Sequence, residues 1–288
     1  MKFAHSIGYL KDISTLFNIE TSLWFSALSV YYIHAGGHTI DLYATKDFKF
    51  LKDLIGYDNY YEIQDDKLIP VSVYSKFKML ALNKMPIDTI HIDNDVFISK
   101  NTAFELIKNS DADMLVQYVY NIQDKEYPEN ICMQNELINS ILYLMSCGIL
   151  TEFPEDLTSI NGGLYKFNNP ELKQLIVENY FSFYHNNADI LNKIPTNYVL
   201  DNYCEEYKNY HTAIDNGYTV KSLEPMRSIT DDNPIYDFYQ DSIGFRHYYG
   251  IKGKYLTQVK YELAQRDYSL FNKIDKWLKD AANKIILA

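Results

Sequence analysis

The sequence predicts an α/β domain in which a central sheet, mixed but mostly parallel, is flanked by helices. Short apolar runs alternate with longer segments of helical spacing over residues 1–100, as expected when crossover helices link parallel strands. The 288 residues are 47% hydrophobic and 23% charged. This is a globular composition, and a chain of this length can bury one large core.

The first hundred residues predict four strands, each of the first three followed by a helix. Strands are expected at 2–7, 39–45, 60–63 and 88–98, and helices at 23–34, 48–55 and 74–82. The first helix rests on the spacing of Leu23, Trp24 and Leu28, and Gly36 and Gly37 are its expected stop. The resulting order is βαβαβαβ, which predicts half of a nucleotide-binding type of sheet.

The second half of the chain is less regular. Strands are expected at 113–119 and 159–167, and helices at 134–145, 171–183, 197–207 and within 255–288. We therefore expect a single domain over residues 1–288, made of a half over 1–100, a second half over 101–254 and a helical segment over 255–288. No internal repeat is present.

Charge and composition exclude several classes of function. The chain has 27 Lys and Arg against 38 Asp and Glu, a formal net charge of -11, which repels nucleic acid. Three cysteines without a C-x-x-C spacing suggest neither a disulfide framework nor a thiolate zinc site. The N-terminus lacks the apolar core of a signal peptide, and no apolar run reaches the ~20 residues that cross a bilayer. We expect a cytoplasmic protein without a transmembrane segment.

The most informative segment ends the predicted strand 88–98. It contains Asp93 and Asp95, two carboxylates separated by one residue at the end of an apolar run. Residues i and i+2 of an extended chain project to the same side, so both carboxylates can converge on one ligand. A hard divalent cation, Mn²⁺ or Mg²⁺, shared with a diphosphate, suits such a pair. Two solvated aspartates at a turn are the alternative, which the preceding apolar run disfavours.

The string IDTIHIDNDVF around these residues resembles the hhDxDhh motif of GT-A glycosyltransferases. It is similar to glycosyltransferase family eight, and to a bacterial group of GT-A-like proteins in which a lysine-bearing helix precedes the motif. Lys78 stands in the place of that lysine. The resemblance implies a GT-A, Rossmann-like nucleotide-diphospho-sugar transferase fold, with nucleotide binding in residues 1–100 and donor and acceptor binding in 101–254.

Two distant stretches extend the resemblance. The string SINGGLYKF contains Asn161, Gly162 and Gly163 and looks like the N-x-G element where small residues let the backbone approach a donor sugar; a strand bulge is the alternative. The string HYYGIKGK resembles the motif H-x-x-G-x-x-K, whose histidine is the third metal ligand and whose lysine meets the diphosphate. His247 fits, whereas Lys252 falls one residue early and Lys254 one late.

The resemblance also implies which residues hold the donor. Asp201 and Asn202 fall where relatives carry a Glu-Gln or Asp-Gln pair beside the reacting sugar, and they are the expected catalytic residues. Asp93, Asp95 and His247 are the expected metal ligands. The expected donor-binding residues are His5, Ser6, Ile7, Lys78, Asp93, Asn94, Asn161, Gly162, Gly163, Gly250, Lys252 and Lys254.

The resulting hypothesis is a metal-dependent glycosyltransferase. It would transfer a sugar from a nucleoside diphosphate donor, expected to be a UDP-sugar, to the hydroxyl of a glycan, lipid, protein or small molecule, with retention of configuration. One alternative is a haloacid-dehalogenase-like phosphatase with Asp93 as nucleophile; that motif usually lies on the first strand of the chain, whereas three βα units precede it here. A catalytically degenerate GT-A domain that binds a nucleotide or glycan is the other.

Overall fold

The computed structural model describes residues 1–8, 16–69, 75–121, 130–191, 193, 200–223, 238–240, 243–248 and 252–286. The larger sheet has seven strands in the order β3-β2-β1-β4-β7-β6-β8, and a smaller sheet has the order β5-β10-β9. The chain forms two compact units, unit 1 (Met1–Ile63, Ile92–Glu105 and Tyr236–Ala288) and unit 2 (Gln64–His91 and Leu106–Ile235). The expected division at 1–100, 101–254 and 255–288 stays a prediction.

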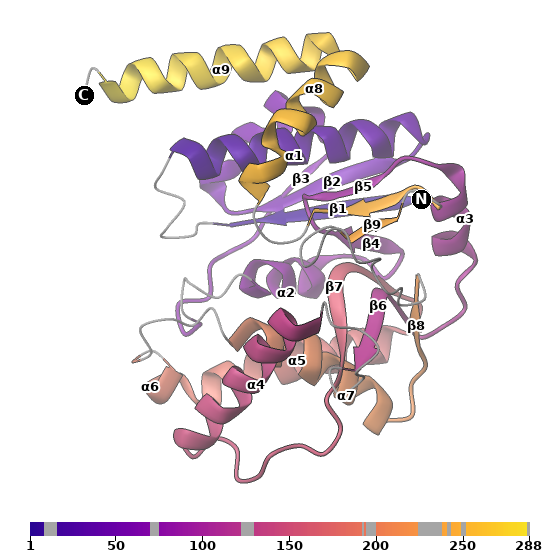
Figure 1. The fold of residues 1–288 in the computed structure, drawn as a ribbon, viewed down its shortest axis with the longest axis vertical. Coiled ribbons are helices and arrows are strands. Elements are labelled where there is room, and N and C mark those ends of the chain that lie inside the picture. Colours follow the sequence, from indigo (N-terminus) through magenta and orange to yellow (C-terminus); the bar gives the residue numbers. More distant parts are fainter. Residues whose placement is uncertain are drawn as a thin grey trace. The chain divides into compact units, whose positions relative to one another are not determined.

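Unit 1 contains three parallel strands and the smaller sheet (Figure 1). The parallel strands are β1 (Lys2–Ile7), β2 (Thr39–Ala44) and β3 (Tyr60–Glu62), with β2 between the other two. The smaller sheet pairs β10 (Phe245–His247) antiparallel with both β5 (Val96–Ile98) and β9 (Phe238–Gln240). A small antiparallel sheet therefore joins β5 to two strands from much later in the sequence.

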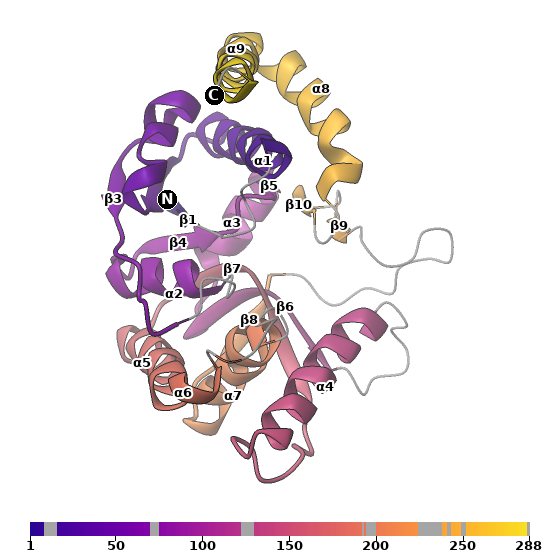
Figure 2. The same ribbon diagram turned by 90° about the vertical axis from the view of Figure 1, so that its left-hand side faces the viewer.

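Three long helices of unit 1 pack together. They are α1 (Leu16–Ala35), α8 (Leu256–Arg266) and α9 (Tyr268–Ile286), and Figures 1 and 2 show α8 and α9 beside α1. The rings of Trp24 and Phe271 lie 5.0 Å apart between α1 and α9. Helix α1 ends as expected, because Gly37 takes the left-handed conformation with φ 75° and the amide of His38 donates to Ile33 O.

Unit 2 combines the other end of the larger sheet with shorter helices. Its strands are β6 (Met114–Asn121), β7 (Thr158–Phe167) and β8 (Val220–Ser222), with most of β4 (Thr89–Ile92). Strand β6 pairs antiparallel with β7 and parallel with β8. Since β1, β2 and β3 are also parallel, the structure confirms the expected α/β class with a mixed, mostly parallel sheet.

The helices of unit 2 are α2 (Ser75–Lys84), α4 (Asn130–Ser146), α5 (Pro170–Asn186), α6 (Ala188–Leu191) and α7 (Lys208–Asp215), and α3 (Asn101–Asn109) begins in unit 1. Local chemistry fixes the start of α5, where the side chain of Asn169 accepts from the amides of Glu171 and Leu172 and Pro170 occupies the first turn. A π-helix, η4 (Asn202–Tyr207), leads directly into α7.

The structure corrects two of the expected elements. Residues 88–98 are two strands, β4 and β5, because residues 93–96 form a turn in which the amide of Val96 donates to Asp93 O at 3.0 Å. Asp and Asn favour such turns. The helix expected at 48–55 is instead a 3₁₀ turn at Lys46–Phe48 and a π-helix at Lys52–Gly56. Among the described residues, no helix is both long and apolar enough to span a membrane.

Candidate metal centre

The turn after β4 presents the two predicted aspartates. The prediction placed them on one extended strand, where alternation would point both to the same side. Instead, the chain reverses at residues 93–96 and continues as β5. The two carboxylates still converge, but a turn brings them together rather than strand alternation.

His247 reaches this turn through strand pairing. In the antiparallel register of β10 and β5, His247 lies opposite Val96. The amide of Tyr248 then donates to Asp95 O at 3.2 Å, which extends the pairing to the acidic turn itself. Register therefore determines which side chain of β10 stands beside the carboxylates, and that side chain is the predicted third ligand.

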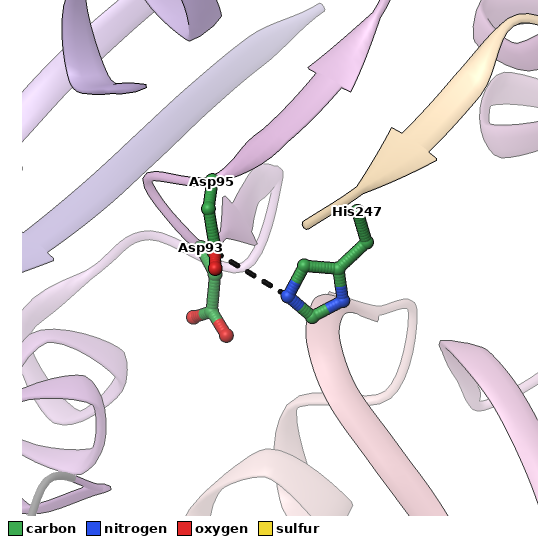
Figure 3. Close-up of side chains that lie close together, drawn as sticks. All are labelled: Asp93, Asp95 and His247. Carbon is green, nitrogen blue, oxygen red and sulfur yellow. Dashed lines mark ion pairs between the residues drawn. The ribbon is translucent and has the colours of Figure 1, made fainter. Parts of the chain in front are cut away.

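Asp93, Asp95 and His247 each offer a ligand atom, and these atoms all lie within 4.8 Å of one another (Figure 3). His247 Nε2 is 3.4 Å from Asp95 Oδ1. Donors that share a cation with bonds of about 2.1 Å lie about 3 Å apart when adjacent, so this spacing fits a bound ion. Among the residues that the structure describes, this is the one group of three such ligands.

Burial strengthens the case for a cation. Asp95 is 3% exposed and His247 is 4% exposed, whereas Asp93 is half-buried. A carboxylate withdrawn from water is unfavourable unless a positive charge or hydrogen bonds compensate it. Two carboxylate oxygens and one imidazole nitrogen suit Mn²⁺ or Mg²⁺. The residues present therefore fit a divalent metal, and the half-buried Asp93 leaves a side of the group open to a ligand.

The residues expected beside the nucleotide base lie at the end of β1. The ring of His5 is fully buried, with Nδ1 2.8 Å from Tyr57 Oη and Nε2 3.1 Å from Ser29 Oγ. Burial lowers the pKa of His5 to about 3, against the opposing effect of the Asp95 charge. Ser6 and Ile7 are half-buried. Of these three residues, only Ser6 and Ile7 are partly exposed.

Two further groups of predicted residues come together in unit 2. Lys78 forms an ion pair with Glu205 and donates to Gly162 O at 2.9 Å. The side chain of Asn161 accepts from the amide of Gly163 at 2.9 Å. The helix lysine and the N-G-G element are therefore neighbours. Glu205 was not predicted, because nothing in its own sequence context marks it; only its pairing with Lys78 does.

Asp201 and Asn202 have partners within unit 2. The carboxylate of Asp201 accepts from both the amide and the hydroxyl of Ser75, at the start of α2. The amide of Asn202 donates to Glu136 Oε2 at 3.0 Å. These contacts tie η4 to α2 and α4, and the expected role of both residues beside a sugar stays a prediction.

The phosphate-binding lysine also stays a prediction. Lys254 is exposed, with Nζ 5.1 Å from the ring centre of Tyr255. The backbone of Lys252 starts the 3₁₀ turn Lys252–Tyr255, but its side chain lies outside the described residues, as does Gly250.

No family model matches the chain. No curated protein matches it in sequence either. Among solved structures, the chain is similar to the galactosyltransferase LgtC in complex with donor and acceptor sugar analogs, with 8% identity over 90% of this chain and 95% of that one and a TM-score of 0.44. It is also similar to the glycosyltransferase GlyE of Streptococcus pneumoniae TIGR4, with 11% identity over 77% of this chain and 44% of that one and a TM-score of 0.35. A third similar structure is mouse xyloside xylosyltransferase 1, with 11% identity over 77% of this chain and 84% of that one and a TM-score of 0.37. With TM-scores below 0.5, these likenesses assign neither a reaction nor a ligand.

Proposed function

We propose that this chain is a divalent-metal-dependent glycosyltransferase that takes a sugar from a nucleoside diphosphate donor, a UDP-sugar, and passes it to an acceptor hydroxyl with retention of configuration. The observation that carries the proposal is the convergence of Asp93, Asp95 and His247 from two segments far apart in the sequence. The hhDxDhh-like string that contains both aspartates supports the same proposal.

The proposed site works by electrostatics. The bound ion, Mn²⁺ or Mg²⁺, would neutralise the charge that develops on the departing diphosphate. Asp93, Asp95 and His247 would hold it, and the burial of Asp95 and His247 lowers the local dielectric constant and strengthens these interactions. The half-buried Asp93 would stand at the side from which the diphosphate enters.

The remaining expected residues keep the roles that the sequence resemblance implies. We propose that Lys252 or Lys254 adds a second positive charge to the diphosphate, and that Asp201 and Asn202 orient the donor sugar. Residues 5–7, at the end of β1, would border the base. The further donor-binding residues of this proposal are Asn94, Lys78, Asn161, Gly162, Gly163 and Gly250.

Ligand-dependent melting tests the donor site. A ligand that binds only the folded protein at 100 times its Kd stabilises it by about 2.7 kcal/mol. We therefore expect UDP with Mn²⁺ to raise the melting temperature clearly more than either alone. If neither UDP nor UDP with Mn²⁺ raises it, the proposed donor site is wrong.

The variant Asp95→Asn tests the metal ligand and the reaction. It keeps the shape of the side chain and removes its charge, so we expect Mn²⁺-dependent hydrolysis of a UDP-sugar to fall by at least about 100-fold, since even supporting residues of metal sites cost about 10–100-fold. Asp41→Asn is a matched control, because Asp41 is fully buried in β2 of the same unit and should leave hydrolysis unchanged. Hydrolysis of p-nitrophenyl phosphate without UDP binding would instead identify a phosphatase.

A further inference from the structure

A serine of helix α1 forms a hydrogen bond at the end of the acidic turn, residues 93–96. Ser29 Oγ donates to the carbonyl of Val96 at 2.7 Å, and Val96 directly follows Asp95. Ser29 is fully buried. Its hydroxyl therefore fixes the peptide between Val96 and Phe97, which directly follows the turn that carries both candidate aspartates.

Two more side chains continue this contact into the core of unit 1. Ser29 Oγ lies 3.1 Å from His5 Nε2, and His5 Nδ1 lies 2.8 Å from Tyr57 Oη. His5 belongs to β1, Ser29 belongs to α1, and Tyr57 follows the π-helix Lys52–Gly56. Three separate elements thus contribute to one hydrogen-bonded chain that ends at the turn.

The chemistry of the groups fixes the direction of every bond. The carbonyl of Val96 can only accept, so Ser29 donates its one proton to it and must accept from His5 Nε2. Because burial keeps the ring of His5 neutral, its Nδ1 carries no proton and accepts from the hydroxyl of Tyr57. The three hydrogen bonds therefore run in one direction, from Tyr57 through His5 and Ser29 to Val96.

We propose that Ser29, His5 and Tyr57 are positioning residues for the metal centre, which hold the 93–96 turn in the geometry that lets its carboxylates and His247 share one cation. The inference rests on the metal site of the proposed function. None of the three residues is a metal ligand; they act through the Val96 carbonyl. Supporting hydrogen bonds of this kind orient the groups that bind a metal.

The test is direct measurement of Mn²⁺ affinity on the full chain, by the electron paramagnetic resonance signal of free Mn²⁺. We expect Ser29→Ala to weaken binding by about 10–100-fold. Tyr57→Phe removes one hydroxyl that lies two hydrogen bonds further from the turn than Ser29, so it should weaken Mn²⁺ binding less. Tyr57→Phe also keeps the test decisive if Ser29→Ala fails to fold, since it removes a single oxygen.

A matched control separates positioning from general stability. Ser140 in α4 is also fully buried, and its hydroxyl donates to Glu136 O at 2.8 Å. Ser140→Ala removes a buried hydroxyl in the same way, but its bond lies within one helix, so this variant should leave Mn²⁺ affinity unchanged. If Ser29→Ala and Tyr57→Phe bind Mn²⁺ as tightly as the wild type, or if Ser140→Ala loses as much Mn²⁺ affinity as Ser29→Ala, the inference is wrong. The proposed function would not be affected by either result. Absence of Mn²⁺ binding to the wild type would overturn the proposed function and the inference with it.

Discussion

Single residues of unit 2 illustrate how burial changes the charge of an acid. Glu206 is 7% exposed, and its Oε2 accepts from the hydroxyl of Tyr120 at 2.8 Å. Burial, and then the neighbouring charge of Glu205, raise its pKa well above the usual range. Folding therefore favours the protonated, neutral form of Glu206, which lies next to Glu205, whose charge is matched by Lys78.

Glu206→Gln should stabilise the protein at pH 7. Above the pKa of the unfolded chain, about 4.5, the folded state keeps a proton that the unfolded state releases, so stability falls as pH rises, by on the order of 1 kcal/mol per pH unit. Glutamine does not titrate and still accepts from Tyr120. In urea unfolding between pH 4 and 8, the free energy of unfolding should fall less with rising pH for the variant than for the wild type. Equal pH dependence in the two proteins would mean that Glu206 is ionised when folded.

Gly162→Ala should disturb the Lys78–Glu205 pair. An added Cβ would overlap the Glu205 carboxylate and approach the buried ring of Tyr165 to 2.9 Å, and overpacking of this kind costs about 1–3 kcal/mol. Chemical unfolding measures the loss. The control is the same change in a Glu205→Ala background, where the main clash is gone and the cost should be smaller. An equal cost in both backgrounds would show that the carboxylate is not what requires glycine here.

At the scale of elements, strand β10 and helix α8 are joined by a charged contact in unit 1. Arg246 of β10 pairs with Glu262 of α8, with Nη2 2.7 Å from Oε1. The guanidinium also lies 5.3 Å from the ring centre of Tyr32 and 5.5 Å from that of Phe97. Burial alone would raise the pKa of Glu262, but the hydrogen bonds from Arg246 and Tyr32 outweigh it and lower the pKa. This contact holds the strand that carries His247.

Glu262→Gln should therefore cost about 2–3 kcal/mol at pH 7, because a buried arginine loses its charged partner. A carboxyl whose pKa is lowered by folding stabilises above its unfolded pKa of about 4.5, and this contribution is lost as pH falls through the folded pKa. In urea unfolding, the difference in free energy of unfolding between wild type and variant should become smaller below pH 4.5. Asp275→Asn, which breaks the exposed pair with Lys279 on α9, should change stability by at most about 0.5 kcal/mol. A gap that is constant with pH would contradict this account.

For the whole molecule, net charge sets the conditions under which a phosphorylated ligand can bind. A chain with 38 acidic and 27 basic residues has a formal net charge of -11, which on balance repels anions. A diphosphate should therefore bind only where a cation compensates its charge, and Asp93, Asp95 and His247 are a group that could hold one.

Removal of metal should consequently abolish UDP binding. With EDTA, we expect UDP to lose its effect on the melting temperature, and addition of excess Mn²⁺ should restore it. Uridine is the matched control, because it lacks phosphate and its weaker effect should not depend on EDTA. Full stabilisation by UDP in EDTA would show that side chains, rather than a metal, hold the diphosphate.

Local chemistry let the sequence by itself determine much of this protein. Strand β1 has the predicted bounds, α1 ends at the predicted glycines, and the α/β class follows from alternating periodicities. The three candidate metal ligands were also named from motifs, because carboxylate spacing and a histidine-glycine string are readable without coordinates. These features depend on residues that lie close together in the chain.

Only the tertiary structure decided the rest. That residues 96–98 form a strand of a separate, smaller sheet depends on β10, a partner far along the chain, which pairs with β5. The role of Glu205 follows only from its ion pair with Lys78. The series of hydrogen bonds that links Tyr57 to Val96 forms only when β1 and α1 pack together. The physical reason is common to all three: hydrogen bonds and ion pairs between distant segments have no periodic or local signature, and burial, which makes them decisive, is a property of the folded chain alone.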